Sequence, residues 1–470
     1  MAEKVRGLQS ANSSSRNAGA IPMKMNGLLI AAIVLAVLSG ILYWSNHRKP
    51  TENAVNVSAD TPPKILALTQ ADITKVDIKK KSGDEVVLAK DEAGKWQIMA
   101  AKPLRADQNE VSSMLSTLSS LGSERLIEQK AGNLADYGLA QPAVELEVTE
   151  KDNKTQKVLL GDNTPAGNAV YVALAGDPRV FTLANYSKTS LDKSAKDLRD
   201  KRLLVFEQDK LSRVELTAKK VDIEFGRNKD QWQIVKPKPL RADDSKVEEL
   251  VRKLGDAKMD LSATDQEQKK AAAAFASGTA VATARVTDAS GTAELQVRKN
   301  KEDYYAKSSA VEGMYKVGSD LGTALDKAVD DFRNKKLFDF GFADPEKIEL
   351  HDGAKAYFLT KGGSDWFSAD GKKVDALGAD GFVEKVRDLS ASGFLDSGFG
   401  AATIDVTATS NGGKRVEKVS ISRVGDHYVA KRDGEPALYQ LDPVVVTGLG
   451  KAAEDLKPAV EPKPEAPKKK

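Results

Sequence analysis

One order of apolar and polar positions occurs twice along the chain. Each copy begins with two short stretches of alternating apolar and polar residues, which is typical of β-strands that bury one face. A strand that starts with tryptophan follows, then a proline turn and a predicted amphipathic helix. The central segments are WQIMAAKPLRAD from Trp96 and WQIVKPKPLRAD from Trp232. Their similarity indicates an internal duplication.

The duplication continues beyond these segments. Apolar residues recur at i, i+3, i+4 and i+7 in both predicted helices. These stripes are Val111, Met114, Leu115 and Leu118 in the first copy and Val247, Leu250, Val251 and Leu254 in the second. Predicted hairpins follow at residues 144–162 and 282–300. Similar phrases, LRDKRLLVF from Leu198 and FRNKKLFDF from Phe332, then end the two copies.

A third, weaker copy follows. It lacks PLRAD, and Lys385 interrupts its helix stripe, but it keeps a hairpin at residues 404–422. Trp366 takes the tryptophan position, and Phe382, Val386 and Leu389 keep the stripe. The pattern therefore predicts an α+β protein with three tandem antiparallel β-rich modules, each with one or two packed helices. The expected modules are residues 65–210, 211–344 and a degenerate 345–457.

The repeated PLRAD phrase is predicted to be the corner between the tryptophan strand and the helix. Proline removes a backbone donor and so ends the strand. Asp107 stands at the helix N-cap, with Glu110 three residues later in a capping-box arrangement. In the second copy, Asp243 or Asp244 can cap the helix.

Arg105 and Arg241 lie between strand and cap, and two interpretations are open. They either lock the turn through an ion pair or carbonyl contact, or they offer guanidinium groups to an acidic partner. The structural interpretation is favoured, and no catalytic site is expected, because no further reactive group repeats with the corner. We expect the tryptophans Trp96, Trp232 and Trp366 to be buried at equivalent positions.

The N-terminal part contains a hydrophobic segment. Residues 27–44, GLLIAAIVLAVLSGILYW, are eighteen uncharged and mostly apolar residues, enough at about 1.5 Å per residue to approach the roughly 30 Å bilayer core. We predict a transmembrane anchor over residues 23–46, after a disordered cytoplasmic tail at 1–22 and before a linker at 47–64. A cleaved signal peptide is the alternative, but the apolar run exceeds the usual length of roughly 7 to 15 residues.

The basic residues beside this segment favour one orientation. Lys4, Arg6, Arg16 and Lys24 precede it, which slightly favours a cytoplasmic N-terminus. We therefore expect a single-pass protein of the cytoplasmic membrane whose bulk is periplasmic or extracytoplasmic. Residues 458–470, rich in proline and lysine, are predicted to be a disordered tail.

Composition excludes several classes of site. The 71 Lys and Arg residues nearly balance 68 Asp and Glu, so no nucleic-acid partner is expected. The chain has no cysteine, which excludes disulfides and thiolate metal sites. The three histidines are not at metal-ligand spacing, and no motif requires a cofactor. The SxxK motif at Ser190 and the GLGKAA segment at Gly448 lack the partners that their chemistry needs.

With DYGLAQPAVELEV from Asp136, the chain resembles a family of bacterial membrane-anchored proteins of unknown function. The residues that carry the resemblance are Trp96, Pro103, Ala106, Asp107, Tyr137, Gly138, Leu139 and Pro142. Members of that family often accompany ABC-type transport systems related to gliding-motility auxiliary components. The resemblance therefore implies a membrane-protein partner such as an ABC transporter subunit, and it implies no catalytic residue. The Tyr-Gly-Leu phrase is absent from the second copy.

Three functional hypotheses follow. The first is a non-enzymatic, membrane-anchored scaffold or binding arm. The second is binding of peptidoglycan or another envelope polysaccharide through exposed Trp and Arg side chains. The third is a glycan-acting enzyme that uses paired carboxylates, such as Asp243 with Asp244 or Asp330 with Asp331. An enzyme needs convergent acids in a pocket, and buried tryptophans would weaken the second hypothesis.

Overall fold

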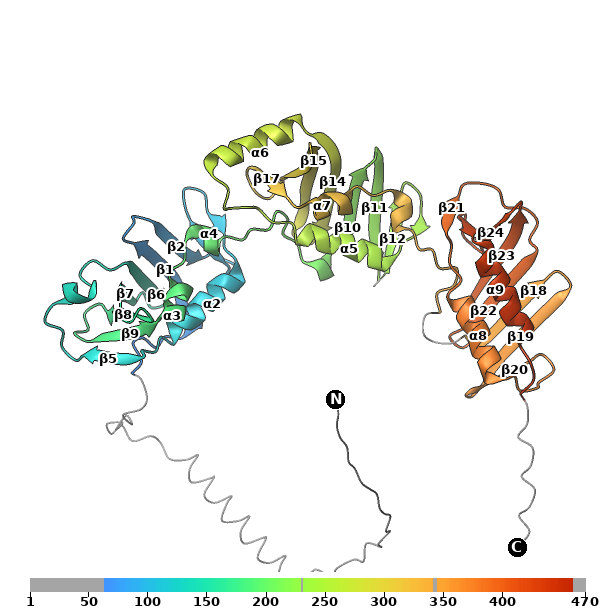
Figure 1. Cartoon of the computed structure of the whole chain (residues 1–470), viewed down its shortest axis with the longest axis horizontal. Helices are drawn as coiled ribbons and strands as arrows, with labels where there is room; N and C mark the ends of the chain where they lie inside the picture. The colour runs from blue at the N-terminus through green and yellow to red at the C-terminus, as the bar shows by residue number, and fades with distance from the viewer. Residues whose placement is uncertain (1–62, 230, 341–344, 460–470) are drawn as a thin grey trace, which may run out of the picture.

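The computed structural model describes residues 63–229, 231–340 and 345–459. In this part of the chain, three antiparallel sheets follow one another, each with its own helices. Figure 1 shows them as three separate bodies in series along an arc. The β-rich α+β class and the three sheets expected from the repeats are confirmed.

The first module holds a nine-stranded sheet in the order β4-β3-β2-β1-β6-β7-β8-β9-β5. Its strands are β1 Ile73–Lys80, β2 Glu85–Lys90, β3 Trp96–Met99, β4 Leu104–Arg105, β5 Arg125–Glu128, β6 Val144–Glu150, β7 Thr155–Asn163, β8 Ala169–Leu174 and β9 Val180–Ala184. Its helices are α2 Gln108–Ser119, α3 Asn185–Leu191 and α4 Ala195–Leu198, with short 3-10 turns η1 Gln70–Asp72 and η2 Leu134–Tyr137.

The second module holds an eight-stranded sheet in the order β13-β12-β11-β10-β14-β15-β16-β17. Its strands are β10 Arg213–Ala218, β11 Val221–Asn228, β12 Gln231–Lys236, β13 Leu240–Arg241, β14 Thr279–Asp288, β15 Gly291–Asn300, β16 Asp303–Ser308 and β17 Met314–Val317. Its helices are α5 Asp244–Gly255, α6 Asp265–Ser277 and α7 Ser319–Leu325, with 3-10 turns η3 Gln208–Lys210 and η4 Val329–Phe332.

The third module holds an eight-stranded sheet in the order β20-β19-β18-β22-β23-β24-β25-β21. Its strands are β18 Lys347–Asp352, β19 Lys355–Gly362, β20 Asp365–Phe367, β21 Gly393–Leu395, β22 Ile404–Ser410, β23 Arg415–Val424, β24 His427–Arg432 and β25 Leu438–Leu441. Its helices are α8 Ala376–Arg387 and α9 Pro443–Glu454. Gly448 lies inside α9 and so belongs to no nucleotide-binding loop.

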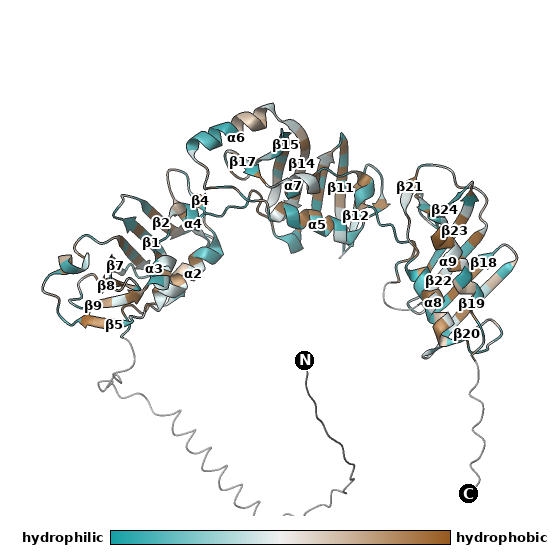
Figure 2. Ribbon diagram, in the orientation of Figure 1, coloured by the Kyte–Doolittle hydropathy of each residue, from teal (hydrophilic) through white to brown (hydrophobic). Residues whose placement is uncertain are grey.

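The core of each module lies between the sheet and its helices. Apolar positions alternate with polar ones along the strands, as Figure 2 shows, so one face of each sheet is apolar and covered by helices. The repeated helices α2 and α5 bury all four residues of their predicted stripes. The three tryptophans are 7%, 4% and 4% exposed at Trp96, Trp232 and Trp366, which confirms their expected burial.

The outer sheet face is covered differently in the first two modules. In the first, the Tyr-Gly-Leu phrase packs over it: Leu139 is buried, and Gly138 has φ 69° where a Cβ would collide with Asp162. In the second, α6 covers β15, β16 and β17 and buries Phe275. The missing phrase is therefore replaced by a helix that the repeat pattern does not predict.

The described residues contain no helix that is both long and apolar enough to cross a bilayer. The anchor predicted for residues 23–46 lies outside the described residues. The predicted tail at residues 1–22 and most of the predicted linker at 47–64 also lie outside them.

Candidate functional site: the joints between modules

The PLRAD corner of the first module binds the segment that leaves the module. Ala106 forms a β-bridge with Arg199. On either side, the Asp107 N–H donates to the Leu198 carbonyl at 2.8 Å and the Asp200 N–H donates to the Arg105 carbonyl at 2.9 Å. The corner is therefore a docking point for the exit segment as well as a strand-to-helix turn.

The second module repeats this arrangement. Ala242 forms a β-bridge with Arg333. The Asp243 N–H donates to the Phe332 carbonyl at 2.8 Å, and the Asn334 N–H donates to the Arg241 carbonyl at 3.0 Å. The PLRAD phrase therefore contacts the phrase that ends the same module. This phrase is LRDKRLL in the first module and FRNKKLF in the second.

The same exit segments also pair with the module that follows. At the first joint, the Leu203 N–H donates to the Ala257 carbonyl at 2.8 Å, and the Met259 N–H donates to the Lys201 carbonyl at 2.7 Å. At the second joint, equivalent bonds join Leu337 with Leu389 and Ala391 with Lys335. Each connection is held by backbone hydrogen bonds on both sides, unlike a flexible linker.

The aspartate of each PLRAD corner caps the helix that follows it. Asp107 accepts from the backbone N–H groups of Asn109 and Glu110. The return contact of a capping box is not formed, because Glu110 points to Lys193 at 3.7 Å; that part of the prediction is wrong. Asp243 caps α5.

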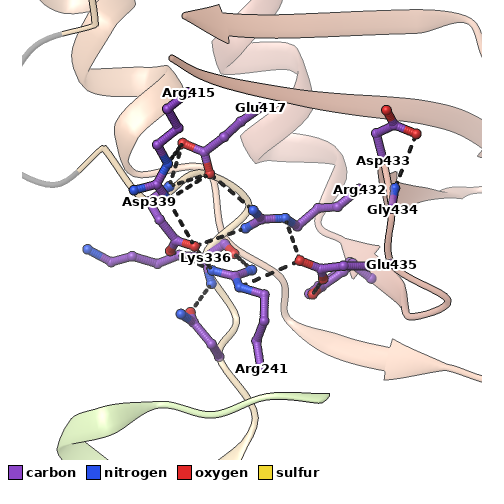
Figure 3. Close-up of polar contacts among 11 residues, drawn as sticks. Arg241, Lys336, Asp339, Arg415, Glu417, Arg432, Asp433, Gly434 and Glu435 are labelled. Carbon is purple, nitrogen blue, oxygen red and sulfur yellow. Dashed lines mark hydrogen bonds and ion pairs between the residues drawn. The ribbon is translucent and has the colours of Figure 1, made fainter. Parts of the chain in front are cut away.

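Arg241 is the centre of the joint between the second and third modules. It donates through Nη1 to the Lys336 carbonyl at 2.7 Å and through Nη2 to the Asp339 carboxylate at 2.5 Å (Figure 3). Its Nε lies 3.7 Å from Glu435 of the third module. The side chain is 19% exposed. One guanidinium thus joins its own module, the connection and the next module.

The third module supplies the rest of this charged cluster. Arg432 contacts Glu417 at 3.0 Å, Glu435 at 3.1 Å and Asp339 at 3.3 Å. Arg415 contacts Glu417 at 3.2 Å, and Glu417 also accepts from the Asp339 N–H. Figure 3 shows the side chains converging beside the connecting segment. Three arginines therefore meet three carboxylates, and the charges that are largely removed from water, those of Arg432 and Glu417, are paired.

The first joint is simpler. Arg105 donates through Nη2 to the Arg202 carbonyl at 2.8 Å, and its Nε lies 4.0 Å from the Asp200 carboxylate. Arg202 binds Asp200 through two nitrogens at 3.0 and 2.8 Å. Burial opposes ionisation of Asp200, but hydrogen bonds from the Arg202 side chain and backbone outweigh it and lower its pKa. Val205 stands where the second exit phrase has Asp339, so the larger cluster cannot form.

Asp200→Asn should weaken the first joint in a pH-dependent way. The folded-state pKa of Asp200 is lowered, so the carboxylate stabilises the fold above its unfolded pKa of about 3.9 and this contribution disappears as the pH falls through the folded-state pKa. We expect a loss of about 1 kcal/mol at pH 7, because Asn still accepts hydrogen bonds. Urea unfolding should show the variant and wild type converging below about pH 4. The exposed Asp209→Asn is the control, and a pH-independent difference would contradict the assignment.

The third module ends differently at the same corner. Val374 forms a β-bridge with Pro458, and the Asp375 N–H donates to the Lys457 carbonyl at 2.8 Å. Lys373 stands where Arg105 and Arg241 stand in the other modules. The corner therefore binds the C-terminal segment by backbone bonds, and the arginine occurs only at the two corners that are followed by another module.

The tryptophans and the paired acids considered for binding or catalysis also make contacts within the fold. Lys90, Arg227 and Lys361 lie over the rings of Trp96, Trp232 and Trp366 at 5.1, 5.4 and 5.4 Å from their centroids. Asp244 accepts from the Trp232 N–H at 2.6 Å. Asp330 pairs with Arg333 at 3.0 Å, and Asp331 accepts from the Ala328 N–H at 2.7 Å. The paired acids thus hold helix starts and turns.

Sequence reasoning found Arg105 and Arg241 but missed most of their partners. Asp339, Glu417, Arg432 and Glu435 carry no motif, and three of them lie far along the chain in the third module. The signal that was available is Asp339, a charged residue in an otherwise apolar part of FRNKKLFDF. Within the described ranges, no group of three His, Cys, Asp or Glu side chains is arranged to hold a metal ion.

Comparison with known proteins gives one result. A family model described as "Domain of unknown function (DUF4340)" matches residues 96–233 and again 232–411, and both matches begin at a tryptophan strand. No curated protein and no solved structure matches the chain. The two matches together cover most of the chain, so the chain belongs to the DUF4340 family.

Proposed function

We propose that this protein is a non-enzymatic scaffold of the bacterial cell envelope. In this proposal, residues 23–46 anchor it in the cytoplasmic membrane, its modules lie outside the cytoplasm, and it serves as an accessory subunit of an ABC-type transport system. The anchor and the partner are inferred from the sequence and from its family resemblance. The modular architecture supports the scaffold role.

The observation that carries the proposal is the clamped joint. A chain that only tethers a catalytic module needs a flexible linker, whereas a scaffold must keep its modules at defined positions. Here both connections are bonded to the preceding and following modules, and arginine side chains add charge-assisted bonds at both. The repeated residues are thus used to hold modules in series.

The residues considered for polysaccharide binding and for glycan hydrolysis have structural contacts, which give these two hypotheses less support. Polysaccharide binding through Trp96, Trp232 and Trp366 would require exposed rings, and all three are buried. The acid pairs considered for glycan hydrolysis accept backbone hydrogen bonds or pair with arginine. A scaffold explains these contacts without an additional role.

Co-purification from membranes tests the proposal. We expect the full-length protein, isolated under mild detergent, to carry transporter subunits in fixed proportion, and protease added to spheroplasts to remove its modules. A variant with both Arg105→Ala and Arg241→Ala should retain less of the partner, because misplaced modules cannot contact it together. Surface variants Asp209→Asn and Lys238→Ala serve as controls. Protection of the modules until lysis, or consistent isolation without a membrane partner, would contradict the proposal.

A further inference from the structure

A groove on the first module differs in chemistry from the rest of this charge-rich protein. It lies between the C-terminal half of α2, the segment that follows α2 and the start of α3, and has a volume of about 550 Å³. This volume is within the range of roughly 300 to 1,000 Å³ that is typical of small-molecule sites. Hydroxyl side chains dominate its lining: Ser116, Thr117, Ser120, Ser123 and Ser187.

After Glu110, the rest of α2 carries no charge, and among the three repeated helices this is a property of the first module alone. Residues 111–123 contain no charged side chain, although 30% of the chain is charged. The equivalent helix α5 exposes Lys246, Glu248, Glu249 and Arg252. At the groove, Lys64 and Glu124 are the charged residues of the lining. The surface is thus poorly suited to a nucleic acid or to anionic lipid headgroups, both of which need a basic patch.

Tyr186 projects beside these hydroxyls. Its side chain is 78% exposed although it is a large aromatic residue on the second position of α3. The equivalent positions are Asp320 on α7, which pairs with Lys253, and Val444 on α9. An exposed ring offers a flat apolar face with a polar hydroxyl at its edge, which fits a ligand that combines both kinds of surface.

Ser187 adds a hydroxyl that opens to the groove. The residue as a whole is only 7% exposed and lines the groove, and the part of the chain that the structure describes shows no hydrogen bond from its hydroxyl. By contrast, the neighbouring Thr189 and Ser190 donate to helix carbonyls, and the buried Ser123 donates to the Pro63 carbonyl. This hydroxyl is not among the buried side-chain atoms of the described residues that lack a partner, so it opens to the groove and can bond a polar ligand there.

We infer that this groove is a binding site for a neutral glycan, with Tyr186 stacking on a sugar ring and Ser187 and neighbouring hydroxyls bonding its hydroxyl groups. A neutral sugar chain has many donors and acceptors and no net charge. Thr117, Ser120 and Ser123 donate to backbone carbonyls, so their oxygens can accept from sugar hydroxyls, whereas Ser187 can donate or accept. The ring faces of a sugar chain are apolar and can cover an aromatic side chain. This site is separate from the buried tryptophans and from the joints, and the inference does not depend on the proposed transport partner.

Titration of the full-length protein with neutral tetrasaccharides tests this inference. Chitotetraose, cellotetraose and maltotetraose are the probes, and saturation-transfer NMR and calorimetry measure binding. We expect at least one to bind, and Tyr186→Ala to weaken it by about tenfold or more through loss of the stacking surface. Ser187→Ala should weaken it less. Val444→Ala, which alters the equivalent exposed position of the third module, should bind like wild type.

Further measurements distinguish loss of the glycan contact from damage to the fold. Hydrogen exchange in α2 and α3 should be unchanged in Tyr186→Ala, because the side chain is exposed, so weaker binding reports the contact itself. Absence of binding by all three sugars at millimolar concentration would overturn the inference. Equal sugar binding by wild type and Tyr186→Ala would also overturn it. So would Tyr186-dependent retention of the protein by anionic phosphatidylglycerol vesicles without sugar binding.

Discussion

Trp232→Ala should lower the free energy of unfolding of the second module by about 3 to 5 kcal/mol. The ring is 4% exposed and belongs to the core formed by the sheet and α5, so its removal leaves a cavity that the surrounding strands cannot fill. The backbone N–H of Trp232 also donates to the Asp244 carboxylate at the start of α5, so movement of β12 in the variant would be transmitted to this helix. Hydrogen exchange measured by mass spectrometry should show faster exchange in this module than in the first.

A neighbouring residue on the same strand supplies the control for this prediction. Val235 is 43% exposed on β12, so Val235→Ala should change stability by about 0.5 kcal/mol or less. Iodide quenching gives a second test, because buried rings should be poorly quenched in the folded protein. Ready quenching of all three module tryptophans, or equal effects of the two substitutions, would contradict the core assignment.

Arg241→Ala should release the third module from the second. The variant loses bonds to the Lys336 carbonyl and to Asp339, and the remaining carboxylates of the cluster have one cation fewer. For a partly buried, multiply bonded arginine, we expect a loss of about 2 to 4 kcal/mol. Exchange of the amides of residues 335–340 should accelerate, and the distance distribution between labels on the two modules should broaden.

An exposed ion pair across the same joint provides the control. Lys238 lies 3.8 Å from Asp396, whose side chain is fully exposed, so Lys238→Ala should have an effect below about 0.5 kcal/mol that vanishes at high salt. Arg241→Lys should only partly restore the joint, because an ammonium group cannot reproduce the forked contacts. A normal distance distribution in Arg241→Ala would show that the backbone bonds alone hold the modules.

The local pattern of apolar and polar residues was sufficient to predict the helices and strands and the burial of particular side chains. The alternation around Trp96, Trp232 and Trp366 and the stripes of the repeated helices depend on residues close in sequence, whose periodicity follows directly from strand and helix geometry. The repeat spacing then gave three modules, because each copy contains the strands and helix that bury one face. Cap positions were also readable, but the return contact of Glu110 was not, since Lys193 competes from the segment between α3 and α4.

The role of the repeated phrase was decided only in three dimensions. From sequence alone, Arg105 and Arg241 could either lock a turn or face a partner, because a guanidinium has no fixed partner until the chain is folded. The carbonyl that Arg105 binds is 97 residues away, and Asp339, which Arg241 binds, is 98 residues away. The neutral groove likewise depends on α3 lying against α2. Sequence periodicity determined which residues face inward, whereas the partners of the polar residues were set by contacts between distant segments, which periodicity does not encode.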